Sequence, residues 1–308
     1  MDTPASPAAA SSKTLSKGQV FARRMLSFVV LWTIVLLALF SGNSRISNAA
    51  CLITMLFFAG TGLWEFYAMV EARQMVCFKR WGTFGGLWLI TGTFLHLTGQ
   101  LGIYGTPARV NDFETVFLIL FVLGLCLCQF FSVSNTAGIL AISTTLFGLM
   151  YVAWLLNFIQ KIIFFPGVDG HFYVLYFVLV TKFSDSGAYV VGSLIGRHKM
   201  IPRISPGKTW EGFGGAILGS TVASLVFAHF LGHHLYGMNR VHAVVLGVIL
   251  SIAAVVGDLI ESLFKRESGL KDSGRLFPGI GGILDLLDSL LFNAPIMYLY
   301  LRHILTHP

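Results

Sequence analysis

Long apolar runs recur along the chain and alternate with short polar segments. A helix needs about 20 mainly apolar residues to cross a bilayer, and this length identifies the candidate spans. They lie near residues 26–41, 49–69, 82–101, 115–133, 137–158, 172–195, 212–232, 241–262 and 280–301. The third is the most polar, because glycine, threonine and His96 interrupt it. The pattern predicts an all-α polytopic membrane protein with about nine transmembrane helices.

The composition agrees with this prediction and limits the partners. Of the 308 residues, 55% are hydrophobic and 11% are charged, whereas a soluble domain contains roughly 25% charged residues. A net charge of +7 could indicate nucleic-acid binding, but basic residues also collect in the cytoplasmic loops of membrane proteins. We therefore expect an integral protein of the cell (inner) membrane that binds no nucleic acid.

The basic residues predict the side of the membrane that each loop faces. With a cytoplasmic N-terminus, fifteen of the 21 Lys and Arg residues fall in inner segments and five in outer segments. This bias predicts a cytoplasmic N-terminus and a C-terminus on the opposite side. The five outer residues are Arg45, Arg109, Lys161, Arg240 and Arg302.

Three regions follow from the composition along the chain. Residues 1–20 are rich in Ala, Ser and Pro and lack periodicity, which predicts a disordered cytoplasmic tail. Residues 21–170 are predicted to form N-terminal transmembrane helices, and residues 171–308 a C-terminal catalytic transmembrane region. The cysteines form no CxxC pair and lie in or beside apolar runs, so we interpret them as packing residues. They are Cys51, Cys77, Cys126 and Cys128.

Charged side chains cluster in the last third of the chain, beside or inside predicted spans. Such residues are costly in a membrane and usually line a polar cavity or take part in chemistry. Their helical spacing places them on single faces of three helices. The first face has Asp258, Glu261, Ser262 and Lys265, the second Asp285 and Asp288, and the third Lys182, Asp185, Ser186 and Tyr189. We expect Asp185, Asp258, Asp285 and Asp288 to line one pocket near the inner surface.

Clustered carboxylates repel one another and need a compensating cation. Carboxylate oxygens suit Mg²⁺, which completes its coordination with water and substrate phosphate. Basic residues near the cluster suit a polyphosphate, so the pattern indicates metal-assisted phosphoryl or nucleotidyl transfer. The alternative is a set of intramembrane salt bridges, such as Asp258 with Lys265, that serves assembly alone. The basic residues are Lys208, Lys265, Arg266, Lys271 and Arg275.

Four sequence blocks between residues 181 and 292 resemble the phosphatidate cytidylyltransferases, also called CDP-diacylglycerol synthases. They occur in the order and spacing of that family. The first 170 residues match it only in hydropathy and in a faint Trp64-Glu65 feature. The blocks are Asp185-Ser186-Gly187-Ala188-Tyr189, Ser205-Pro206-x-Lys208-Thr209-Trp210-Glu211-Gly212, Ser262-x-x-Lys265-Arg266-x4-Lys271-Asp272-x-Gly274, and Pro278-x-x-Gly281-Gly282-x-x-Asp285-x-x-Asp288-Ser289.

The resemblance implies a Mg²⁺-dependent membrane enzyme of phospholipid biosynthesis. It would join CTP and phosphatidic acid at a site facing the cytoplasm, releasing CDP-diacylglycerol and pyrophosphate, and a homodimer is a further expectation. The metal would lie on Asp258 and Asp285, with Asp288 as a further ligand. Lys265 and Lys271 would complete the catalytic set. The nucleotide-binding set would be Asp185, Ser205, Lys208, Ser262, Arg266 and Arg275.

Two positions depart from the family pattern. Ile280 stands where His usually precedes the Gly-Gly pair, and Leu286 where Arg usually follows the first aspartate. The pattern is therefore that of a divergent branch, in which Arg275 is a candidate to supply the missing charge. The alternatives are a CTP-dependent polyprenol or phytol kinase, whose family is distantly similar, and an inactive relative that binds lipid or conducts ions.

Overall fold

The computed structural model describes residues 33, 36–37, 39–40, 42–100, 107–132, 136–270, 272–274 and 281–306. The predicted tail, most of the first predicted span, Lys271, Arg275 and Ile280 lie outside these residues. In chain order the helices and strands are α2 Ser44–Ala72, α3 Lys79–Leu97, α4 Pro107–Phe131, α5 Gly138–Gly148, η1 Leu149–Trp154, α6 Leu155–Ile163, α7 Gly170–Ile195, β1 Lys199–Ile201, β2 Ser205–Thr209, α8 Trp210–Leu231, η2 Gly232–His234, α9 Arg240–Glu267, α10 Ile283–Tyr300 and η3 Leu301–Leu305.

Seven helical segments of the described residues are long and apolar enough to cross a membrane. They match seven of the nine predicted spans, which supports an all-α integral membrane protein, but nine spans are not confirmed. The third predicted span forms α3, a helix of 19 residues that is diluted by glycine and threonine. The seven segments are Ser44–Ala72, Val110–Phe131, Gly138–Ile163, Gly170–Ile195, Trp210–His234, Arg240–Glu267 and Ile283–Leu305.

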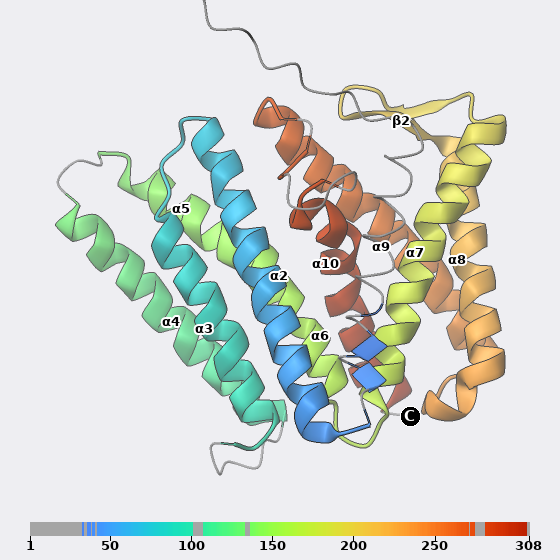
Figure 1. Cartoon of the computed structure of the whole chain (residues 1–308). Coiled ribbons are helices and arrows are strands. Elements are labelled where there is room, and N and C mark those ends of the chain that lie inside the picture. The colour runs from blue at the N-terminus through green and yellow to red at the C-terminus, as the bar shows by residue number, and fades with distance from the viewer. Residues whose placement is uncertain are drawn as a thin grey trace, which may run out of the picture.

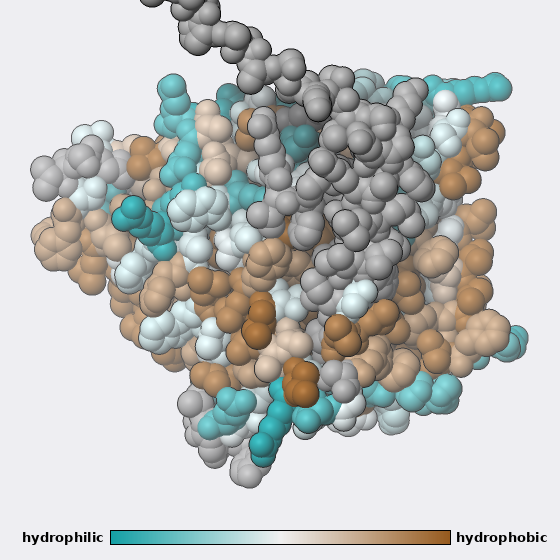
Figure 2. Space-filling model, in the orientation of Figure 1, coloured by the Kyte–Doolittle hydropathy of each residue, from teal (hydrophilic) through white to brown (hydrophobic). Residues whose placement is uncertain are grey.

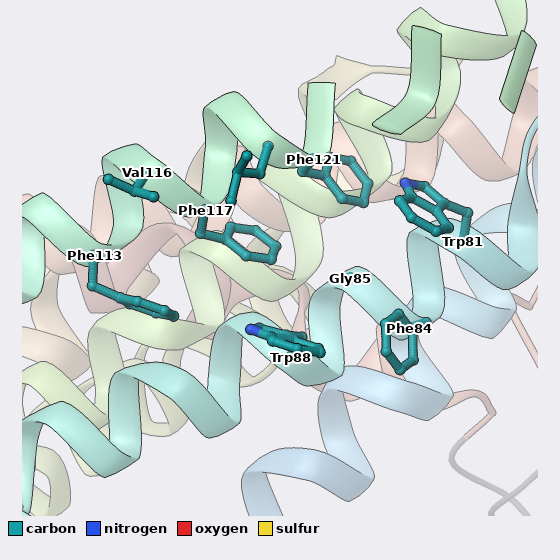
Figure 3. Close-up of a pocket in the computed structure, with 9 residues that line it drawn as sticks. Trp81, Phe84, Gly85, Trp88, Phe113, Val116, Phe117 and Phe121 are labelled. Carbon is teal, nitrogen blue, oxygen red and sulfur yellow. The ribbon is translucent and has the colours of Figure 1, made fainter. Parts of the chain in front are cut away.

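The surface and the packing of these helices agree with a membrane environment. Figure 2 shows hydrophobic residues along the sides of the bundle and hydrophilic residues toward its two ends. Between α3 and α4, aromatic side chains line an apolar recess of about 380 Å³ (Figure 3). An apolar surface of this kind is unfavourable in water and favourable against lipid. The side chains include Trp81, Phe84 and Trp88 of α3 and Phe113, Phe117 and Phe121 of α4.

Helix α10 connects the two halves of the chain. It packs against α2 and α6 of the N-terminal region and against α7 and α9 of the C-terminal region (Figure 1). Its residues Leu284, Leu287 and Leu291 are almost completely buried among these neighbours. Residues at the start of α10 therefore contact both the N-terminal helices and the predicted catalytic region.

Residues 199–209 of the polar segment 196–211 form an antiparallel hairpin between α7 and α8. Lys199 pairs with Thr209 and Ile201 with Ser205, and the hairpin lies at one end of the bundle (Figure 1). Helix α8 begins directly after it, where the Thr209 hydroxyl accepts a hydrogen bond from Gly212 N at 3.1 Å. This cap satisfies one of the first N–H groups of the helix and fixes β2 relative to α8.

The prediction that Lys161 lies in an outer loop is wrong. Lys161 belongs to α6, inside the Gly138–Ile163 segment, and only 5% of it is exposed. Its Nζ lies 2.5 Å from Glu114 Oε2 on α4, and Asn157 donates to Glu114 Oε1 at 2.7 Å. A buried charge requires such a partner, so the ion pair explains how this lysine can be buried between helices. The cytoplasmic N-terminus remains a prediction.

Candidate active site

Charged residues from α7, β2, α9 and α10 meet near the hairpin end of the bundle (Figure 1). Helical spacing accounts for much of this arrangement, because residues three or four apart share one face of a helix. The structure also shows which side chains of different elements form ion pairs, and these pairs divide the charged residues into two groups.

Three carboxylates form the first group. One oxygen from each of Asp258, Glu261 and Asp288 can be chosen so that all three lie within 4.8 Å of one another. Glu261 is completely buried and Asp288 is 8% exposed. Among the described residues, Glu261 Oε1 has no hydrogen-bond partner. Three hard oxygen donors, one of them with a free acceptor atom, fit the requirements of a divalent cation such as Mg²⁺.

Asp285 lies in a second group, centred on Lys265. Lys265 Nζ is 2.6 Å from Asp285 Oδ1 and also forms an ion pair with Glu261. Asp285 Oδ2 accepts hydrogen bonds from Gly282 N at 2.8 Å and Ser273 N at 3.1 Å. Both oxygens of Asp285 thus have partners within the second group. In the first group, the carboxylate beside the predicted Asp258 and Asp288 is that of Glu261.

A pocket of about 510 Å³ adjoins the first group. Asp185, Ser205, Lys208 and Asp258 are among the residues that line it. Lys208 Nζ lies 2.7 Å from Asp258 Oδ2, so the pocket and the three-carboxylate group share Asp258. A phosphate entering this pocket would meet a lysine and a potential metal ligand side by side.

The remaining predicted residues have different positions. The Ser262 hydroxyl donates to Asp258 Oδ1 at 3.3 Å and so belongs to the first group. Arg266 is exposed, and its Nε donates to Ile204 O at 3.2 Å, which connects α9 to the hairpin. Leu286, at the position of the family arginine, is partly buried on α10.

In the part of the chain that the structure describes, the carboxylates of the cluster outnumber its lysines. Asp258 pairs with Lys208, and Lys265 pairs with Asp285 and Glu261, so the proposed salt bridge between Asp258 and Lys265 does not form. Among the described residues, the cluster holds five carboxylates of α7, α9 and α10, and four of them pair with three lysines of α7, β2 and α9. Clustered carboxylates in a partly buried site favour a bound cation. The five carboxylates are Asp185, Asp258, Glu261, Asp285 and Asp288, and the lysines are Lys182, Lys208 and Lys265.

Two acidic residues had no predicted site role. Glu261 was visible in the sequence as a member of the Asp258 face, and its spacing is the signal that could have identified it. Glu65 is 208 residues from Ser273, to which it is hydrogen-bonded. Apart from its faint resemblance to the family, no local pattern connects Glu65 with the site.

Comparison with protein families gives a match to the description "Cytidylyltransferase family" over residues 22–304. The chain belongs to the cytidylyltransferase family. The match includes the N-terminal helices as well as the four blocks, so the resemblance expected from the motifs is confirmed. It also brings α2, and with it Glu65, into the part of the chain that the family shares.

Individual relatives differ in how much of the chain they match. A phosphatidate cytidylyltransferase of Haemophilus influenzae is 32% identical over 291 residues, covering 89% of this chain and 96% of that protein. One of Staphylococcus haemolyticus is 45% identical over 133 residues, 43% of this chain and 50% of that protein. The uncharacterized Escherichia coli protein YnbB is 38% identical over 159 residues, 52% of this chain and 51% of that protein. The matched region thus spans about half the length of the last two.

Proposed function

We propose that this protein transfers CMP from CTP to phosphatidic acid and releases pyrophosphate. The observation that supports this most strongly is the sharing of Asp258 between a three-carboxylate group and a lysine-containing pocket. Such a site suits a nucleoside triphosphate with its cation. The family match and the printed name of the Haemophilus influenzae relative favour cytidylyl transfer to phosphatidate.

In this proposal Asp258, Glu261 and Asp288 hold Mg²⁺. The ion would supply neutralisation of phosphate charge and orientation of the phosphate groups. Lys208 binds a phosphate oxygen from the side of the pocket, and Ser205 and Asp185 contact the rest of the nucleotide. Lys265 keeps Asp285 and Glu261 in place, which preserves the shape of the carboxylate group.

The chemical step requires no covalent enzyme intermediate. A phosphatidate oxygen, already anionic, attacks the α-phosphorus of CTP and forms a new P–O bond. The bond from that phosphorus to the bridging oxygen breaks, and pyrophosphate leaves with its electron pair. The protein contributes binding, alignment of the two phosphates and stabilisation of the developing charge.

We also propose that the site faces the cytoplasm, where CTP is available. The hairpin and the end of α9 carry basic residues, including Arg203, Lys208 and Arg266, and such residues are enriched on the cytoplasmic side. The phosphatidate would approach from the membrane with its headgroup at this surface.

Labelled CTP distinguishes this activity from its rivals. Detergent-solubilised protein with Mg²⁺ is incubated with phosphatidic acid or polyprenol, using CTP labelled at either the α- or the γ-phosphorus. Cytidylyl transfer gives lipid labelled from the α-position only with phosphatidic acid, whereas a kinase gives polyprenol labelled from the γ-position. Asp258→Asn is the inactive control. Absence of labelled lipid in every combination would overturn the proposal and favour an inactive relative.

A further inference from the structure

The Glu65 carboxylate lies at the N-terminus of α10, although it belongs to α2. Its Oε1 accepts a hydrogen bond from Ile283 N at 3.1 Å, and its Oε2 accepts one from Leu284 N at 2.9 Å. The first N–H groups of a helix have no acceptor inside it, and a negative charge there also interacts favourably with the helix dipole. Gly282, which precedes α10, has no side chain to accept these bonds, so Glu65 supplies the acceptors.

Ser273 connects Glu65 to Asp285. The Ser273 hydroxyl oxygen lies 3.2 Å from Glu65 Oε2 and 3.0 Å from Asp285 Oδ2. A hydroxyl has only one hydrogen to donate, so the two carboxylates share it. Ser273 is also buried, which makes this shared contact hard to replace by water. A displacement of Glu65 therefore changes the surroundings of Asp285 as well as the start of α10.

The backbone approaches Glu65 so closely that its carboxylate determines where the chain can lie. A Cβ atom built on Gly282 would lie 2.5 Å from Glu65 Oε2. One on Gly274 would overlap with Glu65 Oε1. Only glycine leaves room for the carboxylate at these two positions. The Glu65 carboxylate is therefore closely packed against Gly274 and Gly282, which are far from it in the sequence.

From these contacts we infer that Glu65 is a positioning residue for the proposed reaction. It holds the first turn of α10 and thereby orients Asp285, which binds Lys265, and Asp288, which joins the three-carboxylate group. The inference rests on the proposed function. Helix α2 would then contribute to the candidate active site, whose other described residues all lie after residue 181.

Glu65→Gln tests the inference with little change of volume. Glutamine has one acceptor oxygen and an NH₂ group in place of the second, so one N–H of α10 loses its partner. We expect kcat to fall by about 10-fold or more, while KM for CTP stays unchanged because the pocket is formed by other elements. Glu65→Asp keeps both carboxylate oxygens, so its kcat should lie between those of Glu65→Gln and the wild type. Glu71→Gln is the matched control, since Glu71 is on the same helix, is half exposed, and among the described residues forms an ion pair with Lys79 alone.

Hydrogen exchange gives a readout that does not depend on activity. The amides of Ile283 and Leu284 should exchange faster in Glu65→Gln than in the wild type and in Glu71→Gln, because local opening of the turn becomes easier. Unchanged kcat per folded molecule together with unchanged exchange would overturn the inference. A lower melting temperature with unchanged kcat would overturn it too, because the role would then be structural. If the wild type forms no CDP-diacylglycerol, the proposed function fails, and exchange alone decides whether Glu65 orders α10.

Discussion

Lys265 Nζ lies 2.6 Å from Asp285 Oδ1 and also pairs with the completely buried Glu261. One ammonium group therefore joins α9 to the first turn of α10 and compensates a carboxylate that water does not solvate. Removing one partner of a buried pair leaves an uncompensated charge, which costs far more than the loss of a surface contact.

For this reason Lys265→Met should destabilise the protein by about 3–5 kcal/mol and abolish most of its turnover. Lys182→Met is the control, because Lys182 is more exposed and lies 3.5 Å from Asp185. The measurement is thermal unfolding in detergent, followed by tryptophan fluorescence, with CTP turnover measured below the transition. Equal effects of the two substitutions would contradict the central position of Lys265.

The metal dependence should separate Glu261 from Asp285. Glu261→Gln removes charge from the three-carboxylate group, so it should raise the Mg²⁺ concentration for half-maximal activity by roughly 10-fold or more. Asp285→Asn should lower turnover by weakening the contact with Lys265, with little change in that concentration. Titration of Mg²⁺ after removal of bound metal by EDTA provides the measurement. A larger shift for Asp285→Asn than for Glu261→Gln would favour a direct metal contact of Asp285.

The buried ion pair between Glu114 and Lys161 should matter for stability. Lys161→Met leaves Glu114 unpaired and should cost about 3–5 kcal/mol, whereas Lys79→Met, at the half-exposed Glu71, should cost about 1 kcal/mol or less. The double variant Glu114→Leu, Lys161→Met should recover much of the loss, because no unpaired charge remains. Denaturation in detergent measures all three, and a double variant less stable than Lys161→Met would contradict this explanation.

The two ends of α8 should lie on opposite sides of the membrane. In a variant without the four native cysteines, Arg203→Cys should react with an impermeant thiol reagent only from the cytoplasmic side. Tyr236→Cys should react only from the other side. Both positions are exposed, so access is limited by the membrane and not by burial. Reaction of both from one side would mean that α8 does not span.

Local patterns were sufficient for the helices and for part of the site. Hydropathy predicted the seven segments that are long and apolar enough to cross a membrane. Helical spacing placed Asp258 and Asp288 on inward faces, because the geometry of a helix relates residues three or four apart wherever it occurs. The same rule placed Glu261 on the helix face of Asp258, but the sequence analysis did not assign Glu261 to the carboxylate group.

Only the tertiary structure decided which charges are partners. Lys208 could have paired with any nearby carboxylate, and its contact with Asp258 depends on how the hairpin packs against α9. Asp285 shares a helix face with Asp288, yet its place in the first turn of α10 directs it to backbone N–H groups. Lys161 pairs with Glu114 across 47 positions of sequence, and Glu65 with Leu284 across 219. Periodicity describes neighbours along one helix, whereas these pairs depend on the packing between helices, which is why the sequence alone did not reveal them.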